Sequence, residues 1–207
     1  PPFSCDGWRL DVAADLGHSE AYNHRFWKKF RKAVKEANED AVILAEHYGN
    51  PSAWLKGQEW DSIMNYDAFM EPVSWFLTGM EKHSDRAEPE KFGDGELFFN
   101  TMRYNMAKLP ENALDAAMNQ LSNHDHSRFL TRTNRRAGRM KDGFDDAGIG
   151  IDYGLFRLAG MLLFTWPGAP TLFYGDEVGV YGWTEPDCRR PYPWGKEDLE
   201  LLEYHRY

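Results

Sequence analysis

GWRLDVAAD (residues 7–15) decides the fold, because this stretch reads as a β-strand and yet carries an arginine and an aspartate two positions apart. Side chains alternate between the two faces of a strand, so Arg9 and Asp11 share one face. The apolar Trp8 and Leu10 occupy the other face. Two charges on a buried strand face are costly unless they pair and serve a further purpose. A structural ion pair and a functional one are both open readings of this stretch.

The chain after this stretch alternates between helical and strand patterns. Apolar residues recur at helical spacing between Lys and Arg residues in 18–40, which predicts an amphipathic helix (Phe26, Phe30, Val34 and Ala37). Further strands are predicted within residues 41–50, 60–65, 113–125 and 169–177, and further helices within 67–79, 96–109, 152–166 and 197–207.

Strands that alternate with helices predict an α/β fold with a parallel sheet. The second strand places Val42, Leu44 and Glu46 on one face. An ionisable group therefore closes that row, as Asp11 does in the first strand, and active sites of (β/α)8 barrels lie at this carboxyl end. A nucleotide-binding open sheet would need a Gly-rich turn, and no G-x-G-x-x-G occurs. Five predicted strands, where a full barrel has eight, indicate a partial (β/α)8 barrel.

The composition argues against several classes of partner and site. A net charge of −9 disfavours nucleic acid and anionic membranes. The most apolar stretch, residues 155–168, contains Arg157 and is too short to span a bilayer. Cys5 and Cys188 lie far apart without metal-ligand spacing, so neither a zinc site nor a disulfide framework is predicted. The aromatic content of 15% suits either a well-filled core or the flat apolar faces of a sugar.

Three carboxylates are predicted at the carboxyl ends of strands. Asp11 and Glu46 end adjacent strands, and Asp125, beside His124, ends the fourth. Glycoside hydrolysis needs such a set, because one carboxylate attacks or stabilises while another donates and then accepts a proton. Arg9 would keep Asp11 ionised. An isolated Asp at a strand end is more simply a cap or a salt bridge, but three in one alternating pattern favour catalysis.

Four ordered motifs resemble the α-amylase family of retaining glycoside hydrolases, in particular its neopullulanase, cyclomaltodextrinase and maltogenic amylase branch. The motifs are GWRLDVAAD (7–15), AEHYGNPSAWL (45–55), QLSNHDHSRFLT (120–131) and PGAPTLFYGDEVGVYGWTEPDCRRPYPW (167–194). The chain departs from the pattern at Ala14, Asp15 and His126, where the branch has Asn, Glu and Thr. These residues flank the expected catalytic ones, so the departures concern sugar preference more than chemistry.

The resemblance implies a role for each predicted catalytic residue. Asp11 would be the nucleophile, and Glu46 the general acid and then the general base. Asp125 would be a third carboxylate that bonds sugar hydroxyls in the transition state. Arg9 would orient Asp11, and His124 would bond the same sugar ring.

Three more residues are implied to bind substrate. Tyr48 stands where this branch usually has Trp and would stack on a sugar just beyond the cleavage point; packing of its loop is the alternative. Glu185 and Arg189 match a pair that bonds sugar on the non-reducing side, with a surface salt bridge as the alternative.

By this resemblance, residues 1–207 correspond to the C-terminal half of a catalytic barrel, roughly strands 4 to 8, without the first half and without a C-terminal β-sandwich. The parent protein would cleave α-1,4 bonds of malto-oligosaccharides or cyclodextrins. The alternatives are an α-glucosidase or α-1,6-acting relative, and an inert half-barrel. The remainder of the parent barrel or a second copy would cover the open sheet edges. No cofactor is assigned; calcium occurs in the family, but no residue here is assigned to it. The branch is often cytoplasmic, and two unpaired cysteines are compatible with that compartment.

Overall fold

The structure, a computed structural model, describes residues 5–206. The strands are β1 (Gly7–Leu10), β2 (Val42–Ala45), β3 (Ser62–Ile63), β4 (Met118–Gln120) and β5 (Ala169–Thr171). The helices are α1 (Glu20–Ala37), α2 (Glu71–Thr78), α3 (Gly95–Met106), α4 (Glu111–Asp115), α5 (Phe129–Arg132), α6 (Tyr153–Thr165) and α7 (Leu199–Tyr204). Each predicted strand and helix is present. No helix within the described residues is both long enough and apolar enough to cross a membrane.

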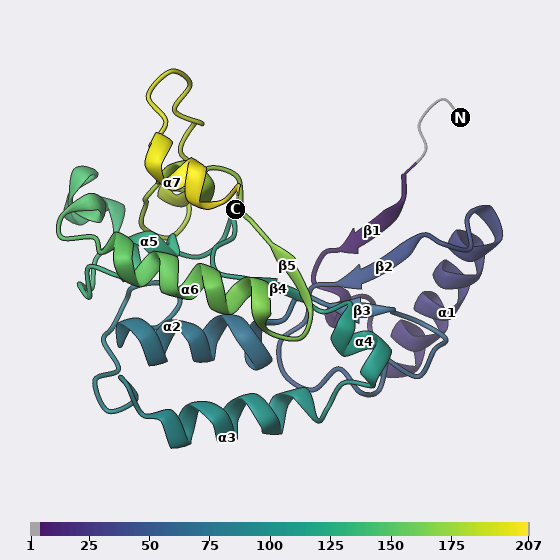
Figure 1. The fold of residues 1–207 in the computed structure, drawn as a ribbon. Coiled ribbons are helices and arrows are strands. Elements are labelled where there is room, and N and C mark those ends of the chain that lie inside the picture. Colours follow the sequence, from purple (N-terminus) through teal and green to yellow (C-terminus); the bar gives the residue numbers. More distant parts are fainter. Residues whose placement is uncertain (1–4, 207) are drawn as a thin grey trace.

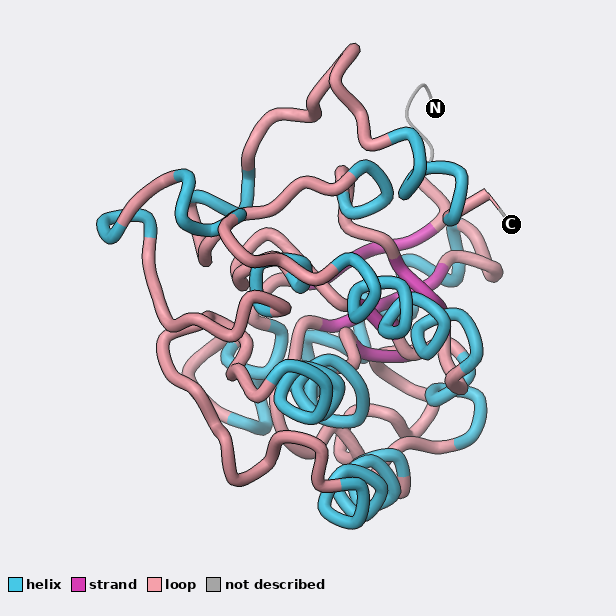
Figure 2. The backbone as a smooth tube through the Cα atoms, turned by 60° about the vertical axis from the view of Figure 1, so that its left-hand side comes forward, coloured by secondary structure: helices cyan, strands magenta, loops and turns pink. Residues whose placement is uncertain are grey.

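The strands run parallel and follow one another in chain order. β1, β2 and β3 form one parallel sheet, and β4 pairs with β5 in parallel. A single parallel bridge between Met64 and Met118 joins the end of β3 to the start of β4. The strands therefore lie beside one another, with α1 on one side and α2, α3 and α6 on the other (Figure 1), and Figure 2 shows them as one group. The predicted α/β class is confirmed.

Helix α1 covers one face of β1 to β3. It begins after Ser19, whose side chain accepts the backbone N–H of Tyr22, an N-cap that satisfies one free donor of the first turn. The buried positions of α1 are Asn23 and Trp27. Phe26, which the spacing placed on the buried face, lies at its edge, because the indole of Trp27 takes the central place and donates to the carbonyl of Ala13 at 2.8 Å.

Two apolar cores fix the elements that carry the site. One joins α1 to the strands and includes Trp27, Ile43 and Ile63. The other is formed mainly by α2, α3, α5, α6 and α7, which gather on the side of the molecule away from α1 (Figure 1). The face of β2 that points away from α1 is open instead, and Val42 on that face is 45% exposed.

The strands are shorter than predicted, which moves Asp125. β4 ends at Gln120, so Asp125 lies in the following loop and not at the strand end itself. The loop leaves the strand because the side-chain oxygen of Asn123 accepts the backbone N–H groups of Asp125 and His126, at 3.0 and 3.1 Å. The side chain of Asn123 thus accepts the backbone N–H groups that, in a longer strand, would bond a neighbouring strand.

Candidate active site

Asp11 and Glu46 leave two neighbouring strands at the same edge of the sheet. β1 and β2 pair in parallel with Leu10 opposite Ala45, and the next residue of each chain segment is a carboxylate. The guanidinium of Arg9 forms an ion pair with Asp11 and a second one with Glu46, with 3.1 Å between Nη2 and Oε2. The predicted pairing of Arg9 with Asp11 is confirmed, and the arginine also joins the second carboxylate.

The two carboxylates differ in their surroundings. The side chain of Glu46 is 12% exposed and accepts the backbone N–H of Val12 at 2.9 Å, whereas that of Asp11 is 78% exposed. Burial alone would lower the pKa of Arg9, but its hydrogen bond to Asp11 and the charge of Glu46 outweigh burial and raise that pKa. Arg9 therefore stays charged and holds both carboxylates at one place.

The loop after β4 carries Asp125 and is held from the side of residues 182–190. The hydroxyl of Thr184 donates to the carbonyl of Asp125 at 2.6 Å. The carbonyl of His124 accepts the side chains of Cys188 at 3.1 Å and Arg189 at 2.9 Å. Burial raises the pKa of the Cys188 thiol to about 11, so Cys188 serves here as a neutral donor.

Glu185 and Arg189 do form a salt bridge, at 2.8 Å. The same guanidinium lies 3.6 Å from a carboxylate oxygen of Asp125, and the imidazole of His124 lies 3.5 Å from it. The pair is therefore part of the Asp125 group and not an isolated ion pair at the surface.

Arg128 holds this loop in place from inside the protein. Its side chain is completely buried, pairs with Asp176 at 2.9 Å, and donates to the carbonyls of Cys188 and Tyr174 at 2.9 and 2.7 Å. Its guanidinium also lies over the ring of Phe173, 3.9 Å from the centroid. The guanidinium of Arg128 thus links the loop after β4 to Tyr174 and Asp176, which follow β5, and to Cys188 in the segment 182–190.

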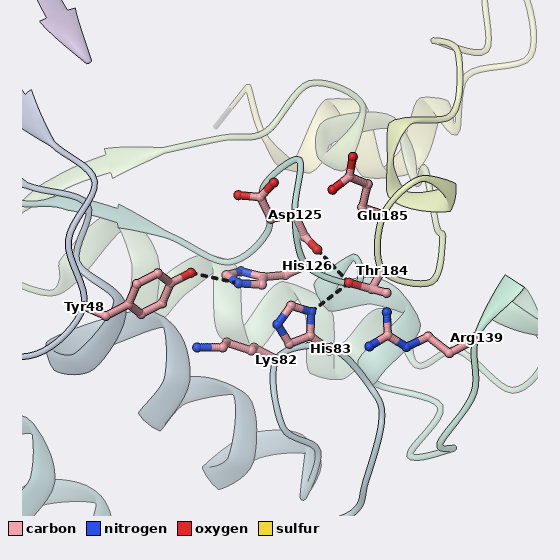
Figure 3. Close-up of a pocket in the computed structure, with 8 residues that line it drawn as sticks. All are labelled: Tyr48, Lys82, His83, Asp125, His126, Arg139, Thr184 and Glu185. Atoms are coloured by element: carbon pink, nitrogen blue, oxygen red, sulfur yellow. Dashed lines mark hydrogen bonds between the residues drawn. The ribbon is translucent and has the colours of Figure 1, made fainter. Parts of the chain in front are cut away.

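A pocket of 520 Å³ lies beside Asp125 (Figure 3). Asp125 and Glu185 line one side of it, and Lys82 and His83 the other. Tyr48, at its end, bonds His126, with 3.2 Å between the hydroxyl and Nε2. A second hollow of 230 Å³, on the face of the strands away from α1, is lined by Arg9 and His124 among others.

Tyr66 connects the two carboxylate groups. Burial raises the pKa of Tyr66 to about 12, and the negative charges of Glu46 and Asp125 both add to the rise. Tyr66 also contacts the loop after β4, because its hydroxyl accepts the side-chain amide of Asn123 at 3.3 Å. Tyr66 stacks on Tyr48 with ring centroids 4.1 Å apart. The predicted site residues thus form two groups, Arg9–Asp11–Glu46 and His124–Asp125–Glu185–Arg189, joined by a tyrosine pair.

Sequence reasoning missed several residues of this region. Tyr66 directly follows the predicted strand segment 60–65. A search for ionisable residues at strand ends, which identified Glu46, would have found it too. Lys82, His83, Arg139 and Thr184 line the pocket from loops that carry no periodic signal. Among residues 5–206, no group of three or more His, Cys, Asp or Glu side chains is placed to hold a metal ion.

Paired carboxylates are what glycoside hydrolysis uses, and the carboxyl ends of parallel strands are where (β/α)8 barrels carry their active sites. Residues 3–198 match the family model "Alpha amylase, catalytic domain". The chain belongs to this α-amylase family.

The chain is similar to enzymes of known name over almost its whole length. It is 37% identical to Neopullulanase 2 of Thermoactinomyces vulgaris over 97% of this chain and 29% of that protein. It is 32% identical to the cyclomaltodextrinase of a Bacillus species, over 97% of this chain and 30% of that protein. Among solved structures, the cyclic α-maltosyl-(1→6)-maltose hydrolase of Arthrobacter globiformis superposes with a TM-score of 0.74 at 32% identity, over 97% of this chain and 38% of that one. The chain therefore spans less than a third of the length of these two curated relatives.

Proposed function

We propose that the protein carrying this chain is a retaining α-glucan hydrolase that cleaves α-1,4-glucosidic bonds of malto-oligosaccharides or cyclodextrins. The observation that carries the proposal is Arg9, which joins Asp11 and Glu46 at the ends of two adjacent parallel strands. An exposed carboxylate and a largely buried one, held together by one cation, suit the two different roles of the reaction.

The reaction would proceed in two displacements. An oxygen of Asp11 attacks the anomeric carbon while the glycosidic C–O bond breaks and Glu46 gives its proton to the leaving oxygen. Glu46, now a carboxylate, takes a proton from water, and that water attacks the anomeric carbon and releases Asp11. Arg9 would balance the charge of Asp11 before it attacks and that of Glu46 once Glu46 has given up its proton.

The other residues would bind the sugar. Asp125 and His124 lie on one loop, and their carboxylate and imidazole are suited to hydroxyls of the ring that reacts. Glu185 and Arg189 extend this polar surface to the non-reducing side. Tyr48 would contact the sugar beyond the cleavage point. Sugar hydroxyls both donate and accept hydrogen bonds, and this set of side chains offers donors and acceptors for them.

The fold is proposed to be the second half of a (β/α)8 barrel, strands 4 to 8. Five parallel strands in chain order with intervening helices support this assignment, as does the share of the relatives that the chain covers. Val42 of β2 and Leu172, which directly follows β5, are 45% and 39% exposed. The remainder of the parent barrel, or a second copy, would cover these surfaces.

Two other functions are supported by specific observations. The solved relative described above is named for a (1→6)-linked maltose ring, which favours an α-1,6-acting enzyme; an α-glucosidase would use the same residues. The exposure of Asp11, 78%, is the observation that favours an inert half-barrel for the chain taken alone.

The test is release of reducing ends from β-cyclodextrin and maltoheptaose, by the 207-residue chain and by the complete protein. Asp11→Asn and Glu46→Gln should each lower kcat by about 1,000-fold or more while maltotriose still binds, because each change removes chemistry and little volume. Asp40→Asn, an exposed aspartate at the opposite end of β2, is the matched control and should leave the rate unchanged.

Near-normal rates in Asp11→Asn or Glu46→Gln would overturn the assignment. NMR of the first product gives the configuration at the anomeric carbon, and an inverted configuration would contradict the retaining mechanism. Turnover by the complete protein but not by the chain would identify the chain as an inactive piece of the enzyme.

A further inference from the structure

Tyr48 and His126 form a contact between two loops that lie 78 residues apart in the sequence. Tyr48 follows β2 and His126 follows β4, and the tyrosine hydroxyl lies 3.2 Å from Nε2 of the histidine. Both residues line the 520 Å³ pocket together with Asp125 (Figure 3). These are also positions at which the chain departs from the pattern of its branch, so the two unusual residues contact each other.

The faces of the Tyr48 ring are already occupied. Tyr66 stacks on the ring at 4.1 Å with an interplanar angle of 11°, and the ammonium of Lys82 lies over it, 4.3 Å from the centroid. A sugar cannot stack on this ring unless Lys82 moves away. The hydroxyl edge is therefore the part of Tyr48 that is offered to a ligand.

His126 is buried where it meets that hydroxyl. It is 1% exposed, and His83 packs edge-on against it with ring centroids 4.7 Å apart. Nδ1 of His83 lies 2.8 Å from the hydroxyl of Thr184, which in turn donates to the carbonyl of Asp125. The histidine is thus built into the same framework as the predicted third carboxylate.

The charges of the pocket are largely balanced within the protein. Lys82 is paired with Glu71, and Arg139 with Asp85. Neither cation is free to select an anionic ligand, and the remaining groups are hydroxyls, imidazoles and carboxylates. A neutral polyhydroxylated molecule fits this chemistry.

We propose that His126 is a positioning residue that fixes the Tyr48 hydroxyl as a hydrogen-bonding group for a sugar at the Tyr48 end of this pocket, on the leaving-group side of the cleaved bond. This proposal rests on the proposed function, from which the sugar class is taken. Burial, with the charges of His83 and Arg132, lowers the pKa of His126 to about 2. The imidazole is therefore neutral, and Nε2 can accept the tyrosine proton or donate to its oxygen.

The test compares His126→Leu, His126→Gln, Tyr48→Phe and the double variant His126→Leu/Tyr48→Phe in the complete protein. Affinity for maltotriose is measured by calorimetry in a Glu46→Gln background, and kcat and KM for maltoheptaose in the unsubstituted one. His126→Leu and Tyr48→Phe should each weaken maltotriose binding about 5- to 10-fold, the effect of one lost hydrogen bond. The double variant should be no weaker than either single one, because both remove the same interaction.

His126→Gln distinguishes positioning from simple packing. Its side-chain amide reaches the place of Nε2, so this variant should recover most of the affinity, and His126→Leu should raise KM more than it lowers kcat. Additive losses in the double variant, or no recovery in His126→Gln, would overturn the proposal.

The outcomes also separate this proposal from the proposed function. Absence of turnover with the same pattern of binding losses would contradict hydrolysis and still support the pair. Full turnover with binding unchanged in all variants would support hydrolysis and contradict the pair. Failure of the Glu46→Gln protein to bind maltotriose would overturn the assignment of this pocket to sugar.

Discussion

Arg9 is the residue on which the geometry of the two carboxylates depends. It lies on β1 and reaches Asp11, which directly follows its own strand, and Glu46, which directly follows the next one. Glu46 receives a second bond, from the backbone N–H of Val12, so it is held from two directions. The residue that donates this second bond, Val12, has a strained backbone conformation.

Val12 occupies the left-handed region, with φ 43° and ψ 45°, which is strained for a β-branched residue. Val12→Gly should raise the free energy of unfolding by about 1 kcal/mol, because relief of this strain exceeds the entropy that glycine adds to the unfolded chain. Little burial is lost, since Val12 is 51% exposed. Urea denaturation measures the change.

Val42→Gly is the matched control for this prediction. Val42 is 45% exposed, like Val12, but it lies in strand β2. The same substitution there should lower stability by about 1 kcal/mol, because glycine weakens an extended strand. A loss of stability in Val12→Gly equal to that in Val42→Gly would contradict the assignment of strain.

The loop after β4 and the segment 182–190 act as one structural element. Hydrogen bonds from Thr184, Cys188 and Arg189 reach the carbonyls of the loop, and the backbone N–H of Arg128 donates to the carbonyl of Gly182 at 2.9 Å. The buried Arg128–Asp176 pair lies at the base of this element. Asp125 is therefore positioned by contacts with a distant segment, and not by a strand.

Arg128→Met should lower the free energy of unfolding by about 3–5 kcal/mol, because it leaves the buried Asp176 without its cation. Burial already raises the pKa of Asp176, which shows how unfavourable the site is for a lone charge. Arg128→Met/Asp176→Leu should recover most of this stability and yet not restore kcat, since the bonds to the carbonyls of Tyr174 and Cys188 stay lost. Denaturation and steady-state kinetics measure the two effects.

Arg157→Met provides the control, because Arg157 pairs with Glu200 at the surface, where the side chains are 32% and 83% exposed. Such pairs contribute about 0–1 kcal/mol. An equally small effect of Arg128→Met would show that the buried pair does not hold the loop.

The molecule as a whole buries neutral histidines, and this makes its stability depend on pH. Burial lowers the pKa values of His47 and His83, and that of His126 falls to about 2. In the unfolded chain each of these groups titrates near 6.5. Below that value the unfolded state binds protons that the folded state does not bind. The stability contribution of these groups is therefore complete above about pH 6.5 and decreases as the pH falls.

His126→Gln should therefore flatten the acid side of the stability profile. Between about pH 7 and about pH 5.5 the variant should lose about 1 kcal/mol less than the unsubstituted protein. Thermal denaturation across this range measures the difference, and His18→Gln, at an exposed position, is the control. Parallel profiles for His126→Gln and the unsubstituted protein would contradict the buried, neutral state of His126.

Contiguous stretches of sequence determined the α/β class, the order of the elements and the residues at the ends of β1 and β2. The alternation of side chains along a strand is local, so the shared face of Arg9 and Asp11 could be predicted from residues 7–15 alone. The same holds for Glu46, which directly follows its strand.

Only the tertiary structure decided which loops meet. Tyr48 with His126, and His83 with Thr184, are 78 and 101 residues apart, and no local pattern encodes such contacts. It also decided that Trp27 and not Phe26 fills the α1 interface, and that Asn123 ends β4 before Asp125 is reached. These outcomes depend on which hydrogen-bond donors and which side-chain volumes the neighbouring elements place at each position. Side chains compete for these positions only once the chain is packed.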